Sequence, residues 1–331
     1  MDQAEWNHLG VTMSADDVLE RFIPYAEKIL ITGCHGLLGQ KLYDLLSPAN
    51  EIIGVDLSPE THLSGRSFRY LTLDITNRGE VTEAVLETEP NVIINTAALT
   101  GVDFCEEERE LCWRVNVTGV ENLIHSAQKN KAHLIQISSD YVFDGQNPPY
   151  RETDVTRPLG FYGKSKLAAE NALRGSEATY SIVRTQILYG IAPHSRPNFV
   201  DFIRESLEKD GDIGIVDDQV GNPTLADDLA RGIARIIQLR RRGIYHVSGS
   251  ESASRFEFAR KITTHLGADA GRIKPIKTES LKQKAPRPPD STFCLDKIQD
   301  ELKFQPRGME DGLTEYIKQL KLRQAAPRGE K

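Results

Sequence analysis

The chain has 331 residues, enough for one large domain or two coupled ones, and 39% of them are hydrophobic, as in ordinary globular proteins. Its 48 acidic and 41 basic residues give a net charge of −7, which argues against a nucleic acid or an anionic membrane as a partner. The sequence has no apolar run of the roughly 20 residues that a membrane-spanning helix needs.

The four cysteines predict a reduced protein without a metal centre. They are Cys34, Cys105, Cys112 and Cys294; they form no C-x-x-C pair, and none stands at a metal-ligand spacing from a histidine. Free thiols are typical of the cytoplasm, so we expect a cytoplasmic location.

Residues 1–26 are predicted to be an N-terminal extension. They carry several acids, whereas a signal peptide would be basic and then apolar. Ser14, followed by two aspartates, predicts a short capped helix over residues 14–22.

Strands alternate with helices from residue 28 to residue 190. The first strand, KILIT at 28–32, is short, apolar and β-branched, as expected of a buried parallel strand. Further strands are predicted at 51–57, 68–75, 91–98, 133–139 and 180–190, and helices after the first strand and at 79–89, 106–129 and 162–173. This alternation predicts an α/β fold with a Rossmann-type doubly wound parallel sheet.

The alternation loosens after residue 190, which predicts a smaller second lobe. We expect helices at 199–209, 224–241, 254–267 and 309–322, strands at 212–218 and 243–249, and a proline-rich loop at 284–296. Residues 27–190 would form a dinucleotide-binding domain, to which 212–249 returns. Residues 191–211 and 250–322 would form a C-terminal substrate-binding lobe, and 323–331 a flexible tail.

The glycine-rich stretch TGCHGLLG, residues 32–39, follows the first strand and opens a helix. Gly33, Gly36 and Gly39 have the spacing G-x-x-G-x-x-G, which permits a tight turn and lets backbone amides approach a pyrophosphate at the helix N-terminus. With His35, Leu37 and Leu38 between them, these residues predict a binding site for NADH or NADPH. The alternative is an ordinary turn between a strand and a helix.

An acidic residue ends the second predicted strand. Asp56 stands 23 residues beyond Gly33, where an acid accepts hydrogen bonds from the adenine ribose hydroxyls. A carboxylate there repels a 2′-phosphate, so it favours NADH, although the nearby Arg66 and Arg69 could tolerate NADPH. The alternative is a solvated acid at a strand end.

The next two strands also end in residues that suit a cofactor. Asp74 and Ile75 end the third strand and could line the adenine pocket. Ala97 and Ala98 end the fourth, and their small side chains would let the backbone run close to the cofactor.

Three residues further along the chain have side chains that suit the reduction of a ketone. Ser139 ends the strand HLIQISS, and Tyr162 and Lys166 stand four apart on a predicted helix face. Reduction needs a proton for the developing alkoxide, and a tyrosine with a pKa of about 10 is a poor proton shuttle near neutrality. A lysine ammonium should lower that pKa, and a serine hydroxyl can donate to the substrate oxygen. This trio matches the Ser/Thr and Tyr-x-x-x-Lys pattern of short-chain dehydrogenases.

From residue 28 to about 320 the sequence resembles the extended short-chain dehydrogenase/reductases, and more narrowly the dTDP-4-dehydrorhamnose reductase family. The motifs that carry the resemblance are TGCHGLLGQKL, WRVNVTGVENL, ISSDYVFDG, FYGKSKLAAE, IVDDQVGNPT and GIYHVSG. ISSDYVFDG and DDQVGNPT are the most diagnostic of the narrower family.

The resemblance implies reduction of the C4 ketone of dTDP-6-deoxy-L-lyxo-4-hexulose to dTDP-L-rhamnose, with a nucleotide-diphosphate sugar as partner. Ser139, Tyr162 and Lys166 take the catalytic roles. Asn116 resembles the helix asparagine that shapes the active site in the superfamily, and we include it among the cofactor-binding residues. The alternative for Asn116 is a polar residue that satisfies backbone groups. A homodimer is an assembly that the sequence allows.

Further residues are expected at the substrate. Asn198 and Phe199 open the first helix of the smaller lobe, whose amides could meet a nucleotide diphosphate. Arg287, in APRPP, could clamp the same diphosphate bidentately, unless it is a surface arginine of the loop. Asp140 and Tyr141, directly after the strand that ends in Ser139, are also predicted to bind the substrate.

One departure from the family concerns an aromatic residue. The rhamnose enzymes commonly carry a tryptophan where RTQILYG has Gln186 and Ile187. The sugar would then differ, or another side chain would cover it, with Tyr141 and Phe161 as candidates.

Two other functions remain open from the sequence. ISSDYVFDG and YGKSKL are also similar to the regulatory β subunit of methionine adenosyltransferase, which implies a nucleotide-binding module with a helical partner. The second open function is that of a nucleotide-sugar epimerase or dehydratase on the same fold. A dehydratase would use an acid beside the catalytic serine, and Asp140 stands at that position.

Overall fold

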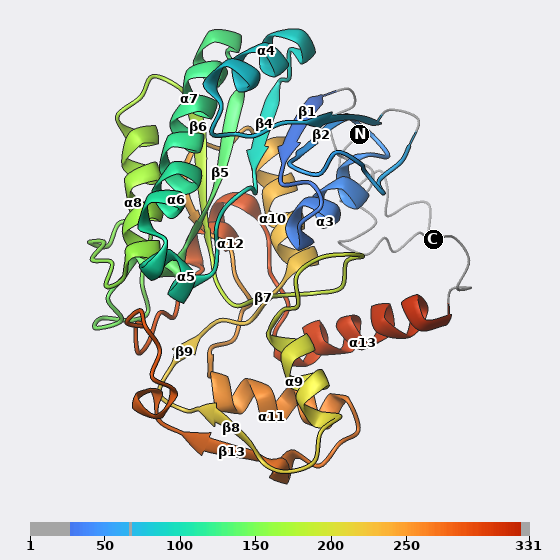
Figure 1. Cartoon of the computed structure of the whole chain (residues 1–331), viewed down its shortest axis with the longest axis vertical. Helices are drawn as coiled ribbons and strands as arrows, with labels where there is room; N and C mark the ends of the chain where they lie inside the picture. The colour runs from blue at the N-terminus through green and yellow to red at the C-terminus, as the bar shows by residue number, and fades with distance from the viewer. Residues whose placement is uncertain (1–26, 66–67, 326–331) are drawn as a thin grey trace, which may run out of the picture.

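The computed structural model describes residues 27–65 and 68–325 (Figure 1). The predicted N-terminal extension with its helix at 14–22, Arg66, and the end of the predicted tail from residue 326 lie outside the described residues. No helix in the described parts of the chain is long and apolar enough to cross a membrane.

A sheet of seven parallel strands forms the larger part of the molecule. The strands lie in the order β11-β6-β5-β4-β1-β2-β3. Their bounds are β1 (Lys28–Thr32), β2 (Glu51–Asp56), β3 (Phe68–Thr72), β4 (Val92–Asn95), β5 (His133–Ser139), β6 (Thr179–Thr185) and β11 (Gly243–His246). The Rossmann-type α/β prediction is confirmed. The strand order reverses between β1 and β4, and sheets of this kind bind ligands outside the carboxyl ends of the strands at such a reversal.

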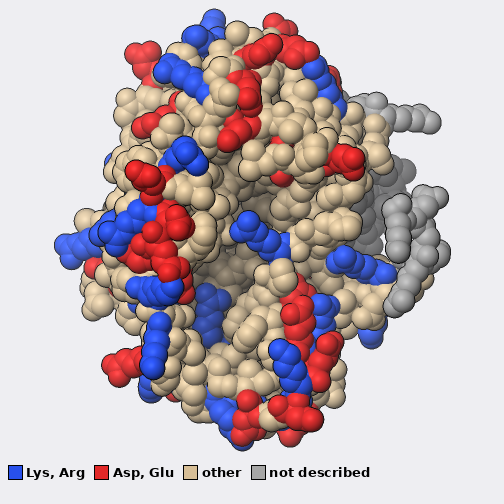
Figure 2. Space-filling view, viewed as in Figure 1, with Lys and Arg blue, Asp and Glu red and all other residues tan. Residues whose placement is uncertain are grey.

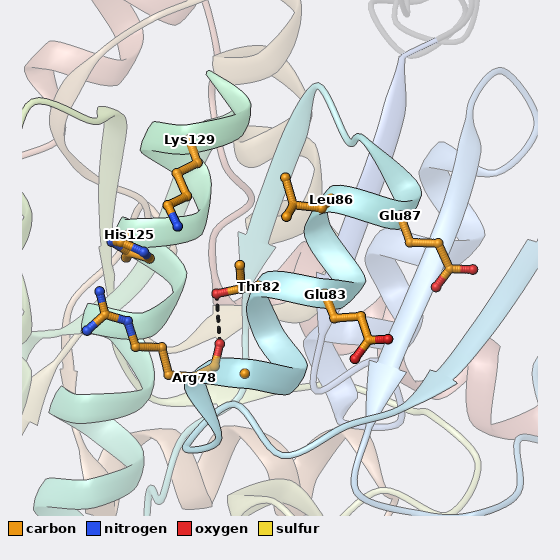
Figure 3. A pocket seen from close by; sticks show the side chains of 8 residues that line it. Arg78, Thr82, Glu83, Leu86, Glu87, His125 and Lys129 are labelled. Atoms are coloured by element: carbon orange, nitrogen blue, oxygen red, sulfur yellow. Dashed lines mark hydrogen bonds between the residues drawn. The ribbon is translucent and has the colours of Figure 1, made fainter.

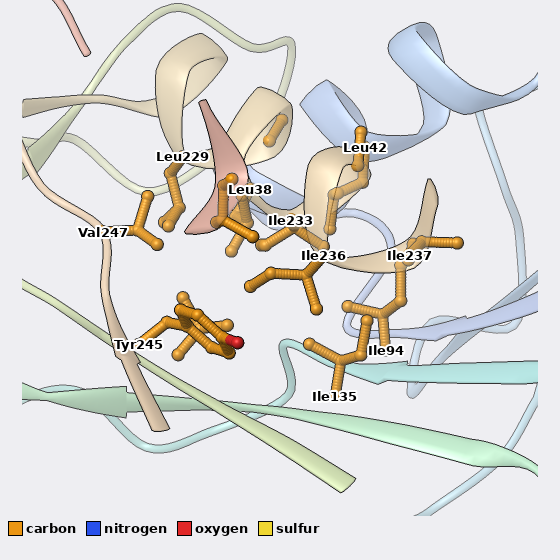
Figure 4. Close-up of a cluster of buried hydrophobic side chains, with 14 of the residues drawn as sticks. Leu38, Leu42, Ile94, Ile135, Leu229, Ile233, Ile236, Ile237, Tyr245 and Val247 are labelled. Carbon is orange, nitrogen blue, oxygen red and sulfur yellow. The ribbon is translucent and has the colours of Figure 1, made fainter. Parts of the chain in front are cut away.

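One face of the sheet is covered by helices from both ends of the chain. Ile29 and Ile31 of β1 contribute to a core completed by α3 (Leu37–Leu46), α10 (Ala226–Gln238) and α12 (Asp296–Leu302). Figure 4 shows Ile233 and Ile236 of α10 lying against the sheet in this core. Burial of branched apolar side chains on the strands and on these helices stabilises this layer.

The opposite face is covered by helices from the first half of the chain. Leu30 and Ile53 point to it because successive strand residues alternate between faces. The helices are α4 (Arg78–Thr88), α7 (Gly119–Asn130) and α8 (Phe161–Arg174) (Figure 1). The helix predicted at 106–129 is divided into α5 (Val102–Glu107), α6 (Arg109–Trp113), a π-helical turn (Arg114–Thr118) and α7.

The smaller lobe lies beyond the carboxyl ends of the strands (Figure 1). Its elements are α9 (Phe199–Leu207), α11 (Arg255–His265), α13 (Met309–Ala325), the pair β8 (Ile213–Val216) and β13 (Ile273–Ile276), and the pair β9 (Val220–Gly221) and β12 (Ala253–Ser254). They share a separate core around Phe258, Leu313 and Tyr316.

The predicted boundary of this lobe requires correction at three places. Residues 213–216 pair with β13 in the smaller lobe and not with the main sheet, because an apolar strand pattern shows burial but not the identity of the partner strand. Helix α12 was not predicted, and it packs on the dinucleotide-binding side through Ile298 and Leu302. Helix α13 continues to Ala325, beyond the predicted start of the tail at 323.

The strand predicted at 180–190 is also interrupted. It divides into β6 and β7 (Leu188–Tyr189), and β7 pairs with β10 (Thr224–Leu225). Ile187 between them has φ +45°, a left-handed conformation that ends regular pairing. The interruption carries the chain from the main sheet into the smaller lobe.

Candidate active site

The glycine loop joins β1 to α3 at the reversal of strand order. Gly33 has φ +67°, and a Cβ atom on it would lie 2.9 Å from both the amide nitrogen of Ala97 and Oγ1 of Thr96. A Cβ atom on Gly39 would lie 2.4 Å from the carbonyl oxygen of Gly33. Gly36 precedes α3 in an extended conformation, and no side chain caps the helix. The backbone amides at this helix start therefore suit the pyrophosphate of a dinucleotide.

The residues between the glycines point in different directions. Leu38 is buried in the core, so only its backbone is available to a ligand. Leu37 is half-buried and faces Gly190, where an added Cβ would lie 3.3 Å from Leu37 Cδ1. The His35 ring stacks on Tyr70 with their centroids 5.2 Å apart.

Asp56 ends β2 beside the glycine loop. Its Oδ2 accepts a hydrogen bond from the backbone amide of His35 at 3.1 Å, and its Oδ1 accepts one from Leu57 at 2.8 Å. A carboxylate has further lone pairs, so these bonds leave Asp56 able to accept from ribose hydroxyls.

The structure brings three potential metal ligands together at this position. Ligand atoms of Cys34, His35 and Asp56 lie within 4.8 Å of one another. Burial, followed by the charge of Asp56, raises the pKa of Cys34 to about 12. Asp56 accepts from the amide of His35, and the ring of His35 stacks on Tyr70, so we assign these contacts to the structure of the loop.

The residues predicted at the ends of β3 and β4 lie around the same edge. Asp74 accepts a hydrogen bond at 2.8 Å from the amide two residues on. Ile75 is buried in the core, and Asn122 donates to its carbonyl oxygen at 3.0 Å. Ala97 and Ala98 are half-buried directly after β4. The side chain of Ile75 thus packs in the core, whereas Asp74, Ala97 and Ala98 lie just beyond the carboxyl ends of β3 and β4.

The structure brings the predicted catalytic trio together at the carboxyl end of β5. Ser139, Tyr162 and Lys166 are each less than one tenth exposed. The Ser139 hydroxyl lies close enough to Tyr162 to lower the pKa of its phenol. Helix α8 lies close to the chain after β5, because a Cβ atom on Gly163 would lie 2.1 Å from the carbonyl oxygen of Tyr141.

Burial controls the protonation of the tyrosine and the lysine. It raises the pKa of Tyr162 well above its usual value; the Ser139 hydroxyl lowers that pKa in part, and the charge of Asp140 raises it. Burial lowers the pKa of Lys166 to about 8, and the charge of Glu170 opposes that shift. The prediction that Lys166 governs the pKa of Tyr162 is therefore not what the structure shows: loss of hydration of the phenolate is the larger effect.

A buried ion pair between Glu170 and Arg184 connects the helix of Tyr162 and Lys166 to the strand of Ser139. Oε1 of Glu170 accepts hydrogen bonds from Ser138 Oγ at 2.6 Å and Arg184 Nε at 2.9 Å, and Oε2 accepts from Arg184 Nη2 at 2.7 Å. Ser138 precedes Ser139 on β5, and Glu170 lies one helical turn after Lys166. The pair therefore fixes α8 against β5 and β6.

Asn116 lies in the π-helical turn and is used by the protein itself. Its Oδ1 accepts from the backbone amide of Leu99 at 2.9 Å, and its Nδ2 donates to the Leu99 carbonyl at 3.0 Å and to Ser165 Oγ at 3.1 Å. This is the alternative in which the residue satisfies backbone groups. It places the chain after β4 against α8, with the buried Cys105 and Cys112 beside it.

The four cysteines are free in the structure, as the sequence predicts. Cys34, Cys105 and Cys112 are buried, and Cys294 is half-buried.

Asp140 was expected to face the substrate, and this expectation is wrong for its side chain. Its Oδ1 accepts from Ser139 Oγ at 2.8 Å and its Oδ2 accepts from Ser291 Oγ at 2.6 Å. Burial raises its pKa, and these two hydrogen bonds lower it. Both oxygens of the carboxyl group are therefore engaged by serine hydroxyls of the protein itself.

Tyr141, predicted to bind the substrate, lies next to Tyr162. Its ring meets that of Tyr162 edge to face, with centroids 5.6 Å apart. Burial raises its pKa, while Arg255 and Arg287 lower it, the latter also by a hydrogen bond.

Arg287 forms a bidentate ion pair across the boundary of the two lobes. Nη1 and Nη2 lie 2.6 Å and 2.9 Å from the two carboxylate oxygens of Asp103 on α5. This bond is the main reason that the pKa of Asp103 is lowered. An arginine has five N–H groups, so the ion pair orients Arg287 without using all of its donors.

Asn198 and Phe199 are engaged within the smaller lobe. The Asn198 side chain caps α9 by accepting from the amide of Val200 at 3.0 Å, and Asp201 completes the capping box. Phe199 stacks on Phe258 with centroids 5.9 Å apart. The helix start is therefore already occupied by an asparagine and a carboxylate, which weakens it as an anion site.

Two residues near the site, Arg255 and Ser291, were not predicted from the sequence. Nor was the hydrogen bond from Gln186 to the carbonyl oxygen of Ser291. Arg255 begins α11, lies 5.5 Å from the ring centroid of Phe199, and acts electrostatically on Tyr141. The capping box that begins at Ser254 predicts the start of this helix, but nothing in the sequence shows where the helix points. Gln186 is buried, so it does not replace the missing aromatic platform.

Basic side chains border the hollow between the lobes, whereas another groove lies far from the site. Figure 2 shows a hollow across the middle of the molecule with lysine and arginine side chains at its edge.

A separate groove of about 810 Å³ lies between α4 and α7, where His125 and Lys129 face Leu86 across it (Figure 3). It contains none of the predicted site residues.

Comparisons with known proteins agree with this geometry. A family model described as the RmlD substrate binding domain matches residues 27–322. The dTDP-4-dehydrorhamnose reductase of Streptomyces griseus is 38% identical over 290 residues, which cover 85% of this chain and 88% of that protein. The spore coat polysaccharide biosynthesis protein SpsK of Bacillus subtilis is 32% identical over 294 residues, with 88% and 97% covered.

A solved structure shows the same arrangement of the chain. The crystal structure of dTDP-4-dehydrorhamnose reductase from Bacillus anthracis, in complex with NADP, superposes with a TM-score of 0.81 at 34% identity and covers 89% of this chain and 99% of that one. Since the family model and these relatives extend over most of the sequence, the chain belongs to the RmlD substrate binding domain family of extended short-chain dehydrogenase/reductases.

Proposed function

We propose that this protein is an NAD(P)H-dependent reductase of the C4 ketone of a dTDP-4-keto-6-deoxy sugar, the reaction that forms dTDP-L-rhamnose. The observation that carries the proposal is the buried Ser139 and Tyr162 pair, with Lys166 on the same helix, at the carboxyl edge of the sheet beside the glycine loop. Relatives at 38% and 34% identity bear the name of this reductase.

Each residue of the trio has a distinct task in this reaction. A bound nicotinamide cofactor supplies the hydride that reaches the carbonyl carbon. Tyr162 donates its phenolic proton to the ketone oxygen, and its raised pKa keeps it in the donor form near neutral pH. The hydroxyl of Ser139 stabilises the negative charge on the same oxygen. Lys166, one helical turn from Tyr162 on α8, would hold the ribose next to the nicotinamide ring.

The substrate site lies between the lobes. Tyr141 covers the sugar ring next to Tyr162, which compensates for the absence of a tryptophan in RTQILYG. Arg287, oriented by Asp103, and Arg255 bind the diphosphate of the nucleotide sugar through charge-assisted hydrogen bonds. The start of α9 at Asn198 adds only backbone contacts. The proposed assembly is a homodimer, for which sedimentation should give twice the mass of the 37.0 kDa chain.

The direct test is oxidation of NADH or NADPH by the purified protein with dTDP-4-keto-L-rhamnose. We expect turnover of roughly 1–100 s⁻¹, measured from the absorbance of the reduced nicotinamide. Reactions without the keto sugar are the control. Tight cofactor binding without turnover would contradict the proposal and favour a nucleotide-binding regulatory module.

Asp56 is expected to set the cofactor preference. Its carboxylate ends β2 beside the glycine loop, where it would accept from the adenine ribose. The nearby His62 adds no positive charge at neutral pH because burial and the neighbouring histidines lower its pKa. Asp56→Asn should therefore raise the affinity for NADPH relative to NADH by about tenfold, because it removes repulsion of the 2′-phosphate. Titration of nicotinamide fluorescence measures both dissociation constants.

Glu60→Gln is the matched control, since it removes one exposed negative charge from the loop that follows Asp56. It should leave the ratio of the two affinities within about twofold. A wild-type protein that strongly prefers NADPH, or an unchanged ratio in Asp56→Asn, would contradict the role given to Asp56.

A further inference from the structure

Ser291 reaches the catalytic serine from a distant part of the chain. It lies in the proline-rich loop near the C-terminal end and is only 4% exposed. Its amide donates to the carbonyl oxygen of Val220 at 3.0 Å, and Val220 in turn donates to the carbonyl oxygen of Pro289 at 2.8 Å. These backbone bonds fix the loop against β9.

The side chain of Ser291 meets the catalytic serine through one carboxyl group. Ser291 Oγ donates to Asp140 Oδ2 at 2.6 Å, while Ser139 Oγ donates to Asp140 Oδ1 at 2.8 Å. Each hydroxyl has a single proton. Asp140 therefore receives one donor on each oxygen, and only one of the two donors belongs to the catalytic trio.

Gln186 holds Ser291 in place. Its Nε2 donates to the carbonyl oxygen of Ser291 at 3.1 Å and to Oδ1 of Asn222 at 3.2 Å, and its Oε1 lies 3.2 Å from Ser291 Oγ. Asn222 is anchored in turn by its donation to the carbonyl oxygen of Gly249 at 3.0 Å. All members of this network are buried, so water does not replace the bonds.

We propose that Ser291 is a positioning residue for the reduction: by donating to Asp140, it releases the hydroxyl of Ser139 to turn toward the ketone oxygen. The inference rests on the proposed function. A carboxylate that has no second donor attracts the proton of Ser139 more strongly, and that proton is then less available to the substrate. A donor on the other oxygen withdraws charge and weakens this competition.

The charged groups around Asp140 fit this role. Arg255 of α11 stabilises the ionised carboxyl group, whereas Tyr141 and Tyr162 lie beside it, and their pKa values are raised in part by its charge. Gln186 contributes no charge. Removing the Ser291 hydroxyl takes away a bond that lowers the pKa of Asp140, so that pKa should rise.

Ser291→Ala tests the inference in the assay with dTDP-4-keto-L-rhamnose. We expect kcat to fall by about 10- to 100-fold with little change in the KM of the cofactor, and this loss to become smaller at low pH, where protonation of Asp140 weakens its competition for the Ser139 proton. Ser291→Thr, which keeps a hydroxyl, should restore most of the activity.

The matched control is Thr292→Ala in the same loop, since its hydroxyl donates to Asp290 at 2.6 Å and not to Asp140. It should retain the activity and pH profile of the wild type. Equal kcat and pH profiles in Ser291→Ala and the wild type would overturn the inference and leave the proposed function intact.

An infrared titration separates the inference from the proposed function. The C=O stretch of the protonated Asp140 carboxyl group, identified by its loss in Asp140→Asn, should titrate at higher pH in Ser291→Ala than in the wild type. This measurement needs no substrate. A titration that does not move overturns the inference even if the wild type proves inactive, an outcome that by itself contradicts only the proposed function.

Discussion

Tyr162→Phe is expected to lower kcat by about 100- to 10,000-fold, because phenylalanine has no proton for the ketone oxygen. The ring itself should remain in place, since it packs against Tyr141 and against the buried Cys105 and Cys112. Binding of the nicotinamide cofactor should therefore stay within about twofold of the wild type. The kinetic assay with dTDP-4-keto-L-rhamnose and a fluorescence titration of the cofactor measure the two quantities separately.

Tyr180→Phe is a suitable control for this variant. Tyr180 lies half-buried in β6 and packs against the core on the α8 side of the sheet, away from the trio. It should keep the activity of the wild type. If Tyr162→Phe retained more than about a tenth of wild-type kcat, another group would have to supply the proton, and the role of Tyr162 would be contradicted.

Arg184→Met is expected to lower the free energy of unfolding by about 3–5 kcal/mol, because it leaves the Glu170 carboxylate buried without its partner. Glu170 and Arg184 are 0% and 1% exposed, and two short hydrogen bonds join them. The guanidinium group also lies 5.1 Å from the ring centroid of Phe143. Denaturant titration of the cofactor-free protein measures the loss.

Two further variants make this test specific to the buried pair. Arg69→Met breaks the Arg69 and Glu87 ion pair, in which both side chains are more than two fifths exposed, and should cost at most about 1 kcal/mol. Glu170→Leu combined with Arg184→Met should recover part of the loss, since no charge is then left buried. A change below about 1 kcal/mol in Arg184→Met alone would show that the ion pair does not stabilise the fold.

The loss of this pair should also reach the active site. Glu170 holds Ser138 beside the catalytic Ser139 and lies one turn after Lys166. A cavity or a free carboxylate between β5 and α8 would disturb the spacing of the trio. The same residues therefore contribute to stability and to the geometry on which catalysis depends.

Local sequence patterns predicted the parts of this protein that depend on local physics. Apolar, β-branched runs alternating with amphipathic stretches predicted the strands and helices of the main sheet, since burial of one face requires these periods. The glycine spacing at 33, 36 and 39 predicted a tight turn that larger side chains would block, and the structure shows those close approaches. Tyr162 and Lys166 fall on one helix face because of their spacing alone.

The tertiary structure decided which polar groups meet, because hydrogen-bond partners come from segments far apart in the chain. Asp140 pairs with Ser291, 151 residues away, and Arg287 pairs with Asp103, 184 residues away. The strand at 213–216 joins the smaller lobe because its partner is β13, which its own sequence does not specify. Burial, which also follows from tertiary packing, raises the pKa of Tyr162 where the spacing of Lys166 alone predicts a decrease.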